Sequence, residues 1–339
     1  MRVRAVGITM VCAQLLISAC GGKSGSSPLS PSELAGTLSF TAAPIEPAAL
    51  QYIVPLGNMG PWAHTFPTDH AYFYHHLQSG PFTPVPILAP AAGTIENTYP
   101  GLNSEVKVWV HVNSQFTYYF DHVVLTPGLT VGSRVDAGMP IGTSGGVAFD
   151  FAVRDMNTDI GFISPGRYGM DTVHARSPLP YFVEPLRSQF YALVQRVGGD
   201  ADGQVNYDRD GTLAGNWFAE DLPIANSSTN DINVGTRQLA FARDVRFPDR
   251  QRVSIGGFGI TGLYGVPPDA PDFTAITPGS GTVIFRLLET GEPGGAPGTR
   301  QFALLLTQLV DARRLRIEVV LDGLGTSAVF SANATTYIR

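Results

Sequence analysis

The sequence predicts an all-β protein in which one short helix joins two antiparallel β domains. Apolar residues alternate with polar ones in many short runs, glycines and prolines separate these runs, and one stretch has helical periodicity. The chain has 339 residues, including 38 glycines and 26 prolines, and its length suits two domains. With 44% hydrophobic and 15% charged residues, it has the composition of a folded protein.

The N-terminus is typical of an export signal. Arg2 and Arg4 precede an apolar stretch, residues 6–17, that is too short to span a bilayer comfortably. Residues Leu16 to Cys20 resemble a bacterial lipobox, in which the cysteine is lipidated and becomes the first mature residue. The alternative is an ordinary secretory signal with a chance cysteine. We therefore expect an exported protein, lipid-anchored through Cys20 in the cell envelope, at the outer membrane facing the periplasm or at the cell surface.

Removal of a signal peptide at residues 1–19 also removes Cys12 and leaves Cys20 as the only cysteine. Neither a disulfide nor a thiolate metal site is then available, so a metal would be held by His, Asp or Glu. A flexible tether at 20–33, rich in Gly, Ser and Pro, leads to a first domain at 34–198 and a second at 199–339. The net charge of −6, without a basic run, argues against a nucleic-acid partner.

Alternation in the first domain predicts short antiparallel strands. Residues 70–76 alternate, as do residues 105–112, which place four valines on one face. Asn113-Ser114 offers a tight turn, and residues 116–124 return as the partner strand of a hairpin. Glycines punctuate residues 131–143, which predicts turns between brief strands, and residues 147–153 form a further strand.

The single helical pattern covers residues 185–197, where Pro185 suits a first turn and Gly198-Gly199 would end the helix. The apolar residues of one face are Leu186, Phe190, Leu193, Val194 and Val197. Alternation then resumes in the second domain, at residues 283–288, 302–309, 314–321 and 329–338. Short connections between these runs predict an antiparallel meander, either closed as a barrel or packed as a sandwich.

All seven histidines lie between His64 and His174, which marks the first domain as the place for any chemistry. Histidine is the commonest metal ligand and the main acid or base near neutral pH. Three segments of this domain carry the polar side chains of interest. These segments are His64 to Asp69, Tyr118 to His122, and Gly142 to Val153.

These segments resemble the lysostaphin-type zinc endopeptidases, over roughly residues 50–155. Residues 89–95, Ala-Pro-Ala-Ala-Gly-Thr-Ile, look like the alanine/glycine strand that follows the first ligand pair in that family. The glycines of residues 131–145 look like its approach to the last ligand strand. Tyr119-Phe120-Asp121-His122 looks like its Tyr-x-His segment with one residue added. The resemblance implies a small antiparallel β domain, a zinc site and a peptide or peptidoglycan substrate.

By this resemblance the metal ligands fall on His64, Asp69 and Asp150, and one catalytic histidine falls on His122. The chain departs from the family pattern in two ways. Four residues, rather than three, separate His64 from Asp69, and the final His-x-His is replaced by Ala148 and Asp150. Two carboxylates make a bound metal a weaker Lewis acid and relax selectivity toward ions harder than zinc. Ala148 cannot perform acid–base chemistry, so proton delivery would fall on His122 alone.

Other interpretations of the first motif remain open. His64 and Asp69 also fit a loop in which Asp69 caps a turn that Pro67 fixes. His70, His75 and His76 could substitute as ligands, and His70 is the best of them because it adjoins Asp69.

Strand alternation bears on the other two positions. Asp150 shares a face with Ala148 and Ala152, away from Phe149 and Phe151, so it should point away from the core. The alternative for Asp150 is a solvent-facing strand residue. Strict alternation groups His122 with apolar neighbours, so its alternative is a buried histidine hydrogen-bonded to the backbone.

Three functions are compatible with this sequence. The first is a lipid-anchored, metal-dependent peptidase acting on peptides or peptidoglycan. The second is a catalytically inactive member of the same fold that binds peptidoglycan or a partner, which the loss of histidine at Ala148 favours. The third is an envelope adhesin or assembly factor whose metal site is structural.

Overall fold

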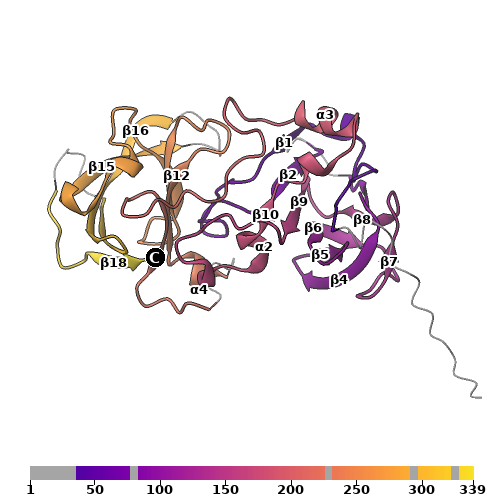
Figure 1. Cartoon of the computed structure of the whole chain (residues 1–339). Helices are drawn as coiled ribbons and strands as arrows, with labels where there is room; N and C mark the ends of the chain where they lie inside the picture. Colours follow the sequence, from indigo (N-terminus) through magenta and orange to yellow (C-terminus); the bar gives the residue numbers. More distant parts are fainter. Residues whose placement is uncertain (1–35, 77–82, 226–230, 291–296, 322–327) are drawn as a thin grey trace, which may run out of the picture.

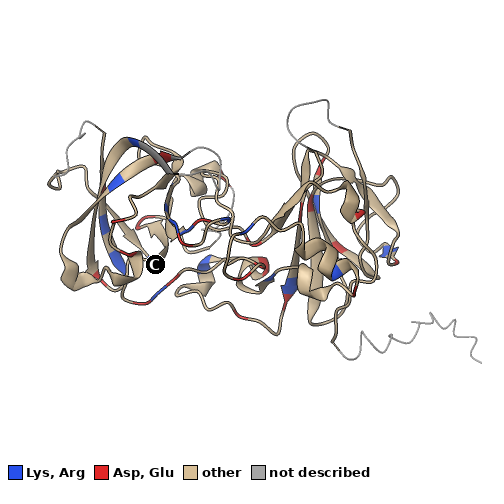
Figure 2. Ribbon diagram, turned by 90° about the horizontal axis from the view of Figure 1, so that it is seen from above, with Lys and Arg blue, Asp and Glu red and all other residues tan. Residues whose placement is uncertain are grey.

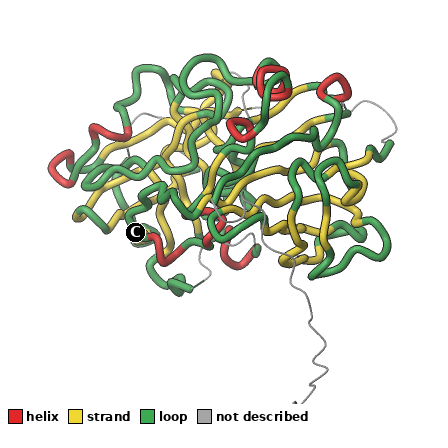
Figure 3. The backbone as a smooth tube through the Cα atoms, turned by 45° about the vertical axis from the view of Figure 1, so that its right-hand side comes forward, coloured by secondary structure: helices red, strands yellow, loops and turns green. Residues whose placement is uncertain are grey.

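The structure is a computed structural model that describes residues 36–76, 83–225, 231–290, 297–321 and 328–339. The predicted signal peptide, the tether and Cys20 lie outside the described residues. Figure 1 shows two β units side by side, with helix α2 (Met170–Val173) between them. Strands and loops make up most of the backbone, and the helices are short (Figure 3). In the described part of the chain, no helix is both long and apolar enough to cross a membrane.

The first unit is a ten-stranded antiparallel sheet in which seven strands follow the order β1-β2-β9-β6-β5-β4-β7. Strand β10 pairs with β9, and the short pair β3 and β8 joins the sheet through β6. The strands are β1 (Tyr52–Val54), β2 (Ala71–Tyr74), β3 (Pro86–Leu88), β4 (Gly93–Pro100), β5 (Val106–His111), β6 (Phe116–Leu125), β7 (Arg134–Val135), β8 (Pro140–Ser144), β9 (Ala148–Asp155) and β10 (Ala175–Arg176).

The predicted hairpin is confirmed in β5 and β6. Its turn is held by Asn113, whose side-chain oxygen accepts hydrogen bonds from the backbone N–H groups of Gln115 and Phe116. One face of the sheet buries an aromatic core in which Phe73, Phe120 and Phe151 pack together. The opposite face is thereby left to carry polar side chains.

The helix α3 (Leu186–Tyr191) is shorter than predicted. The sequence pattern continues to Val197, but Val194 forms a parallel bridge with Ile53 of β1. The N–H of Ile53 donates to Leu193 O, and the N–H of Gln195 donates to Ile53 O. These bonds use backbone groups that a longer helix would need, so pairing with β1 outweighs the helical periodicity.

The second unit is a closed antiparallel barrel with the strand order β11 to β18, closed by pairing of β11 with β18. The all-β class and the meander are therefore confirmed, and the barrel alternative holds. The strands are β11 (Gly215–Ala219), β12 (Gln238–Arg243), β13 (Gln251–Ile255), β14 (Gly262–Gly265), β15 (Val283–Thr290), β16 (Pro297–Asp311), β17 (Arg314–Val320) and β18 (Thr335–Ile338). Strand β18 is shorter than the run predicted at residues 329–338. Strand β16 is longer than the run predicted at residues 302–309.

The barrel has its own apolar core, with the buried side chains of Trp217, Phe241, Phe285 and Leu305. Closure leaves no open sheet edge, which removes a site of aggregation. The domain boundary predicted at residue 198 falls between β10 and β11 and stays a prediction. The short helix α4 (Ile232–Gly235) lies between β11 and β12 and faces the first unit. Positive and negative residues are interspersed along the described ribbon of both units (Figure 2).

Candidate functional site

The polar face of the first sheet contains Asp150 of β9. Its neighbours in register are Tyr72 on β2 and Asp121 on β6, while Phe149 and Phe151 lie in the core. The prediction that Asp150 points away from the core is thus correct. The alternative of a solvent-facing residue is wrong, because Asp150 is only 2% exposed. Its Oδ1 atom is buried and has no hydrogen-bond partner among the residues that the structure describes.

His122 lies in a β-bulge of β6. Val108 pairs with Phe120 and Val106 with Val123, so Asp121 and His122 together oppose the single residue between the two valines. His122 has a φ of 60°. Such a bulge adds one residue and re-aims a side chain. The bulge accommodates the one residue by which Tyr119 to His122 exceeds the Tyr-x-His segment that it resembles.

The bulge also overturns the face predicted for His122. Beyond it, Val123 is buried in the core and Val124 is exposed, the reverse of strict alternation. The His122 side chain is 50% exposed and turns toward carboxylates rather than the core. Its Nδ1 lies 2.8 Å from Glu105 Oε2 and its Nε2 lies 3.7 Å from Asp150 Oδ2.

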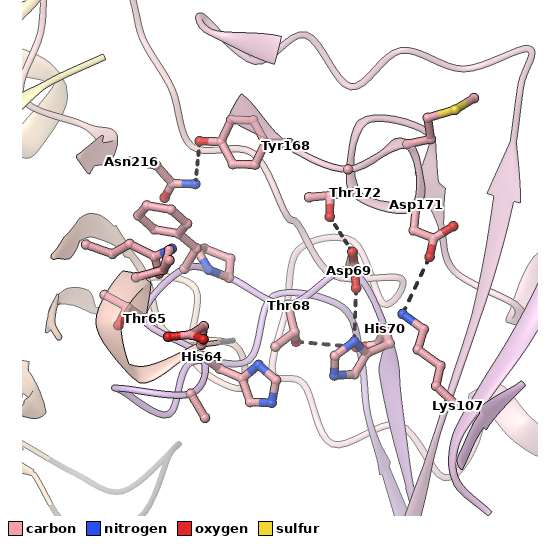
Figure 4. A pocket seen from close by; sticks show the side chains of 18 of the residues that line it. His64, Thr65, Thr68, Asp69, His70, Lys107, Tyr168, Asp171, Thr172 and Asn216 are labelled. Atoms are coloured by element: carbon pink, nitrogen blue, oxygen red, sulfur yellow. Dashed lines mark hydrogen bonds and ion pairs between the residues drawn. The ribbon is translucent and has the colours of Figure 1, made fainter. Parts of the chain in front are cut away.

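His70 occupies the centre of the site. Its Nδ1 lies 3.0 Å from Asp69 Oδ1, and its Nε2 lies 3.2 Å from Asp150 Oδ2. The same Nε2 lies 3.1 Å from the Tyr72 hydroxyl. Figure 4 shows the ring of His70 beside Asp69. Because both ring nitrogens face carboxylates, the arrangement suits the doubly protonated imidazolium.

Asp69 is held from three directions. Besides His70, the Tyr119 hydroxyl donates to its Oδ1 over 2.8 Å, and the Thr172 hydroxyl of α2 donates to its Oδ2 over 2.5 Å. The bond from Thr172 is drawn in Figure 4. Asp69 therefore binds a histidine and two hydroxyl groups rather than capping a turn.

His64 lies in the loop before Asp69, with its ring 5.4 Å from the ring of His70 between centroids. Burial, and then the positive charge of His70, lower the pKa of His64 from 6.5 to about 3. His64 is therefore neutral at physiological pH, as a metal ligand or hydrogen-bond acceptor must be.

The other charges follow from the same contacts. Burial alone lowers the pKa of His70, but the carboxylates of Asp150 and Asp69 outweigh it and raise that pKa above its ordinary value. Burial raises the pKa of Asp150, against the attraction of His70 and His122. Burial also acts to raise the pKa of Asp69, but the hydrogen bond from His70 and the charge of Lys107 hold it well below its usual range. Burial acts to lower the pKa of His122, but the charge of Asp150 and the hydrogen bond to Glu105 outweigh it and raise that pKa.

A cleft of about 1300 Å³ lies between the sheet face and the barrel. His64, Asp69 and His70 line it, while Asp150 lies behind His70. The sheet also contributes Glu96, Lys107, Trp109 and Arg154, and the barrel side contributes Asn216, Leu222, Pro223 and Gln238. The site is therefore shared by both units.

Asp171 of α2 organises the charges in this cleft. It accepts a hydrogen bond of 2.7 Å from Trp109 Nε1 and pairs with Arg154 at 3.2 Å and Lys107 at 3.5 Å. The ammonium of Lys107 also lies 3.8 Å from the centre of the Tyr119 ring. The cleft thus offers fixed charges of both signs beside aromatic rings.

A His/Asp group that could hold a metal ion is present. Within the described ranges, Asp121, His122 and Asp150 offer ligand atoms that all lie within 4.8 Å of one another. His64 and Asp69 are not members of this group, so His64, Asp69 and Asp150 stay a prediction as a ligand set. The buried Oδ1 of Asp150, without a hydrogen-bond partner among the described residues, fits a metal ligand or a protonated carboxyl, and the mixed N/O donors suit zinc or a harder ion.

Sequence reasoning missed several residues of the site. It predicts His70 only as a substitute ligand, although His70 shares the alternation of Tyr72 and lies next to Asp69. Asp121 shares the alternation of Tyr119 and could have been found in the same way. Lys107 and Asp171 carry no local signal, because only tertiary packing brings α2 onto the sheet.

The chain matches no protein-family profile and no curated protein. Several solved structures resemble it in part. Csd3 of Helicobacter pylori, in an orthorhombic crystal, aligns with 45% of this chain and 39% of its own, at 16% identity and a TM-score of 0.31. A zinc-containing peptidase from Vibrio cholerae aligns with 35% of this chain and 37% of its own, at 17% identity and a TM-score of 0.29. The catalytic domain of the M23 protein EnpA from Enterococcus faecalis aligns with 34% of this chain and 87% of its own, at 15% identity and a TM-score of 0.23.

The chain spans 30% and 39% of the length of the two Csd3 structures that it matches. The resemblance to lysostaphin-type peptidases inferred from the sequence reappears among these proteins. Because their TM-scores lie below 0.5, we infer the chemistry of the site from the residues of this chain alone.

Proposed function

We propose that this protein is a peptidase-like binding module that holds peptides, such as those of peptidoglycan, in the cleft without hydrolysing them. One observation carries the proposal: His70 stands between Asp69 and Asp150, with one ring nitrogen directed at each carboxylate. The site thereby contains a cation of its own.

A buried pair of carboxylates needs a positive charge nearby, because an unpaired buried charge is costly. In a metallopeptidase a metal ion supplies that charge, together with an activated water. Here the imidazolium of His70 supplies the charge, but it cannot activate water as a Lewis acid does. Ala148 also supplies no acid or base. Binding without catalysis follows from these two features.

The cleft has the groups that bind a peptide. Lys107 and Arg154 suit carboxylates and Glu96 and Asp171 suit amines, so a charged peptide would exchange its own groups for the ion pairs that these side chains make with one another. Trp109 offers an aromatic surface. A peptidoglycan stem peptide presents both kinds of charge.

The test combines metal analysis, binding and hydrolysis on the full chain. We expect substoichiometric zinc after purification, sedimentation of the protein with insoluble peptidoglycan, and no release of peptide or amine with added Zn²⁺. His70→Gln should keep the fold and reduce sedimentation, since the carboxylates lose their cation. His111→Gln is the matched control, because His111 is exposed and absent from the cleft lining.

Two results would overturn this proposal. Stoichiometric metal together with peptide release that Asp150→Asn abolishes would identify a hydrolase. Failure of the wild-type protein to sediment with peptidoglycan, or to bind any peptide from it, would remove the ligand.

The second candidate function is metal-dependent peptide hydrolysis, favoured by the orphaned Oδ1 of Asp150. Asp121, His122 and Asp150 would hold the ion, zinc first among candidates, and a bound zinc would supply an activated water. Asp121→Asn and His122→Gln should then each lower bound metal at least tenfold. Unchanged metal content in both variants would exclude this ligand set, and loss in His64→Ala and Asp69→Ala would favour the set that the sequence predicts.

We also propose that the chain is exported and anchored by lipid on Cys20, with the tether giving the folded units reach from the outer membrane. The support is the sequence of residues 1–33 alone. Labelling of cells with a radioactive fatty acid should mark the wild-type protein and not Cys20→Ser. Equal labelling of both would contradict the anchor.

A further inference from the structure

The candidate residues His64, Asp69 and His70 lie in a short hairpin and in the two residues that join it to β2. In this hairpin, residues 57–68, the N–H of Gly57 donates to Thr68 O and the N–H of Thr68 donates to Asn58 O. Gly60 and His64 exchange two backbone hydrogen bonds of 2.8 and 2.9 Å. The hairpin then continues directly into Asp69, His70 and β2. Its position therefore sets the position of three site residues.

The hairpin is packed into the barrel rather than into its own sheet. Met59 and Phe66 belong to the barrel core together with Trp217 and Phe218, and not to the aromatic core of the sheet. The Phe66 ring lies 5.0 Å from the Phe218 ring of β11, in an edge-to-face arrangement. Burial of two large side chains ties the hairpin to the barrel through the strongest non-directional force in folding.

A hydrogen bond fixes the register of this contact. Thr65 is fully buried, and its hydroxyl donates to Gly235 O of α4 over 3.1 Å. The approach is close: a β-carbon on Gly235 would lie 2.3 Å from Trp62 O, and one on Gly256 would lie 2.8 Å from Thr65 Oγ1. Glycines are therefore required where the barrel meets the hairpin.

We propose that the C-terminal barrel is the positioning element of the candidate site: through Phe66 and Thr65 it fixes the hairpin that places His64, Asp69 and His70. The barrel is thus part of the site rather than an independent module. Phe66 and Thr65 also line the cleft, but we assign them a positioning role because their contacts with Phe218 and Gly235 hold the hairpin against the barrel. The inference concerns the site of the proposed function, and only its binding readout rests on that function.

Two pairs of variants separate positioning from simple stability. Thr65→Val removes the bond to Gly235, and Thr307→Val removes a matched bond of 3.1 Å from a buried threonine to Val283 O elsewhere in the barrel. Phe66→Leu is matched by Phe285→Leu, because Phe285 is equally a core residue but contacts Phe241 and Phe273 instead. Thr65→Ser keeps the hydroxyl and should behave as wild type.

The primary readout is the pair of imidazole ¹⁵N chemical shifts of His70 in histidine-labelled full-length protein, measured beside Tm. We expect Thr65→Val and Phe66→Leu to move the His70 signals and to weaken peptidoglycan binding about fivefold, or about 1 kcal/mol. Thr307→Val and Phe285→Leu should lower Tm comparably and leave the His70 signals in place.

The proposal is overturned if Thr65→Val and Phe66→Leu lower Tm with unmoved His70 signals, or if the controls move those signals equally. If Thr65→Val fails to fold, Phe66→Leu and Thr65→Ser still decide the question. Absence of peptidoglycan binding by wild type would count against the proposed function, while the His70 signals would still test the positioning role.

Discussion

His64 should make the protein less stable in mild acid, and His64→Gln should remove that effect. Its pKa falls from 6.5 to about 3 on folding, mainly because of burial. Between these values the unfolded chain binds a proton that the folded chain does not, so stability falls as pH falls below 6.5. At pH 5, which is 1.5 units below the unfolded pKa, the loss is about 2 kcal/mol at 1.36 kcal/mol per unit.

The assay is urea unfolding of wild type and His64→Gln at pH 5 and pH 8. The variant's stability relative to wild type should rise by about 2 kcal/mol from pH 8 to pH 5, whatever the constant cost of the substitution. His111→Gln, outside the cleft, reports the general effect of replacing a histidine. A difference that changes by less than about 0.5 kcal/mol would refute the burial argument for His64.

Three further predictions concern other buried contacts, one in the candidate site and two in the barrel core. His70 has a raised pKa, so its stabilising effect is complete below the unfolded value of 6.5 and is lost as pH rises through the folded pKa. His70→Gln should therefore cost most near pH 5 and progressively less as pH rises above 6.5 in the same urea assay. Phe66→Ala should lower the free energy of unfolding by about 3–5 kcal/mol because it leaves a cavity in the barrel core, and a cost below about 1 kcal/mol would show that the hairpin is not anchored there. Asp244→Asn should cost about 3 kcal/mol by calorimetry, since it leaves the fully buried guanidinium of Arg252 without the carboxylate that lies 2.7 Å away, and a neutral result would show that water compensates that charge.

Local patterns predicted the strands well because a half-buried strand must alternate. The hairpin of β5 and β6, the strand of Asp150 and the antiparallel meander of the second unit all follow from that rule, while only the structure shows that the meander closes as a barrel. The failures occur where tertiary contacts replace local ones. Pairing of Val194 with β1 shortens the helix, and the bulge at His122 reverses the faces of the residues after it.

In the candidate site, too, some residues could be predicted from the sequence and others only from tertiary contacts. The sequence placed Asp69, His122 and Asp150 in one region, and the structure brings Asp69 and Asp150 against His70 and His122 against Asp150. No periodicity could show that both nitrogens of His70 are directed at carboxylates, because Asp69 and Asp150 are distant in sequence. Tertiary packing also brings α2 onto the sheet, where Thr172 donates a hydrogen bond to Asp69 and Asp171 pairs with Lys107.

By itself the sequence determined the all-β class and the two units, since composition and alternation are local properties, and its histidines and its family resemblance pointed to the first unit as the place of the site. Only the tertiary structure decided that His70 pairs with Asp69 and Asp150, and that the hairpin before them packs into the barrel. The energies of buried charges depend on distances of a few ångströms between strands, and the barrel that anchors the hairpin of His64 begins about 150 residues further along the chain. Those distances exist only after the chain has folded.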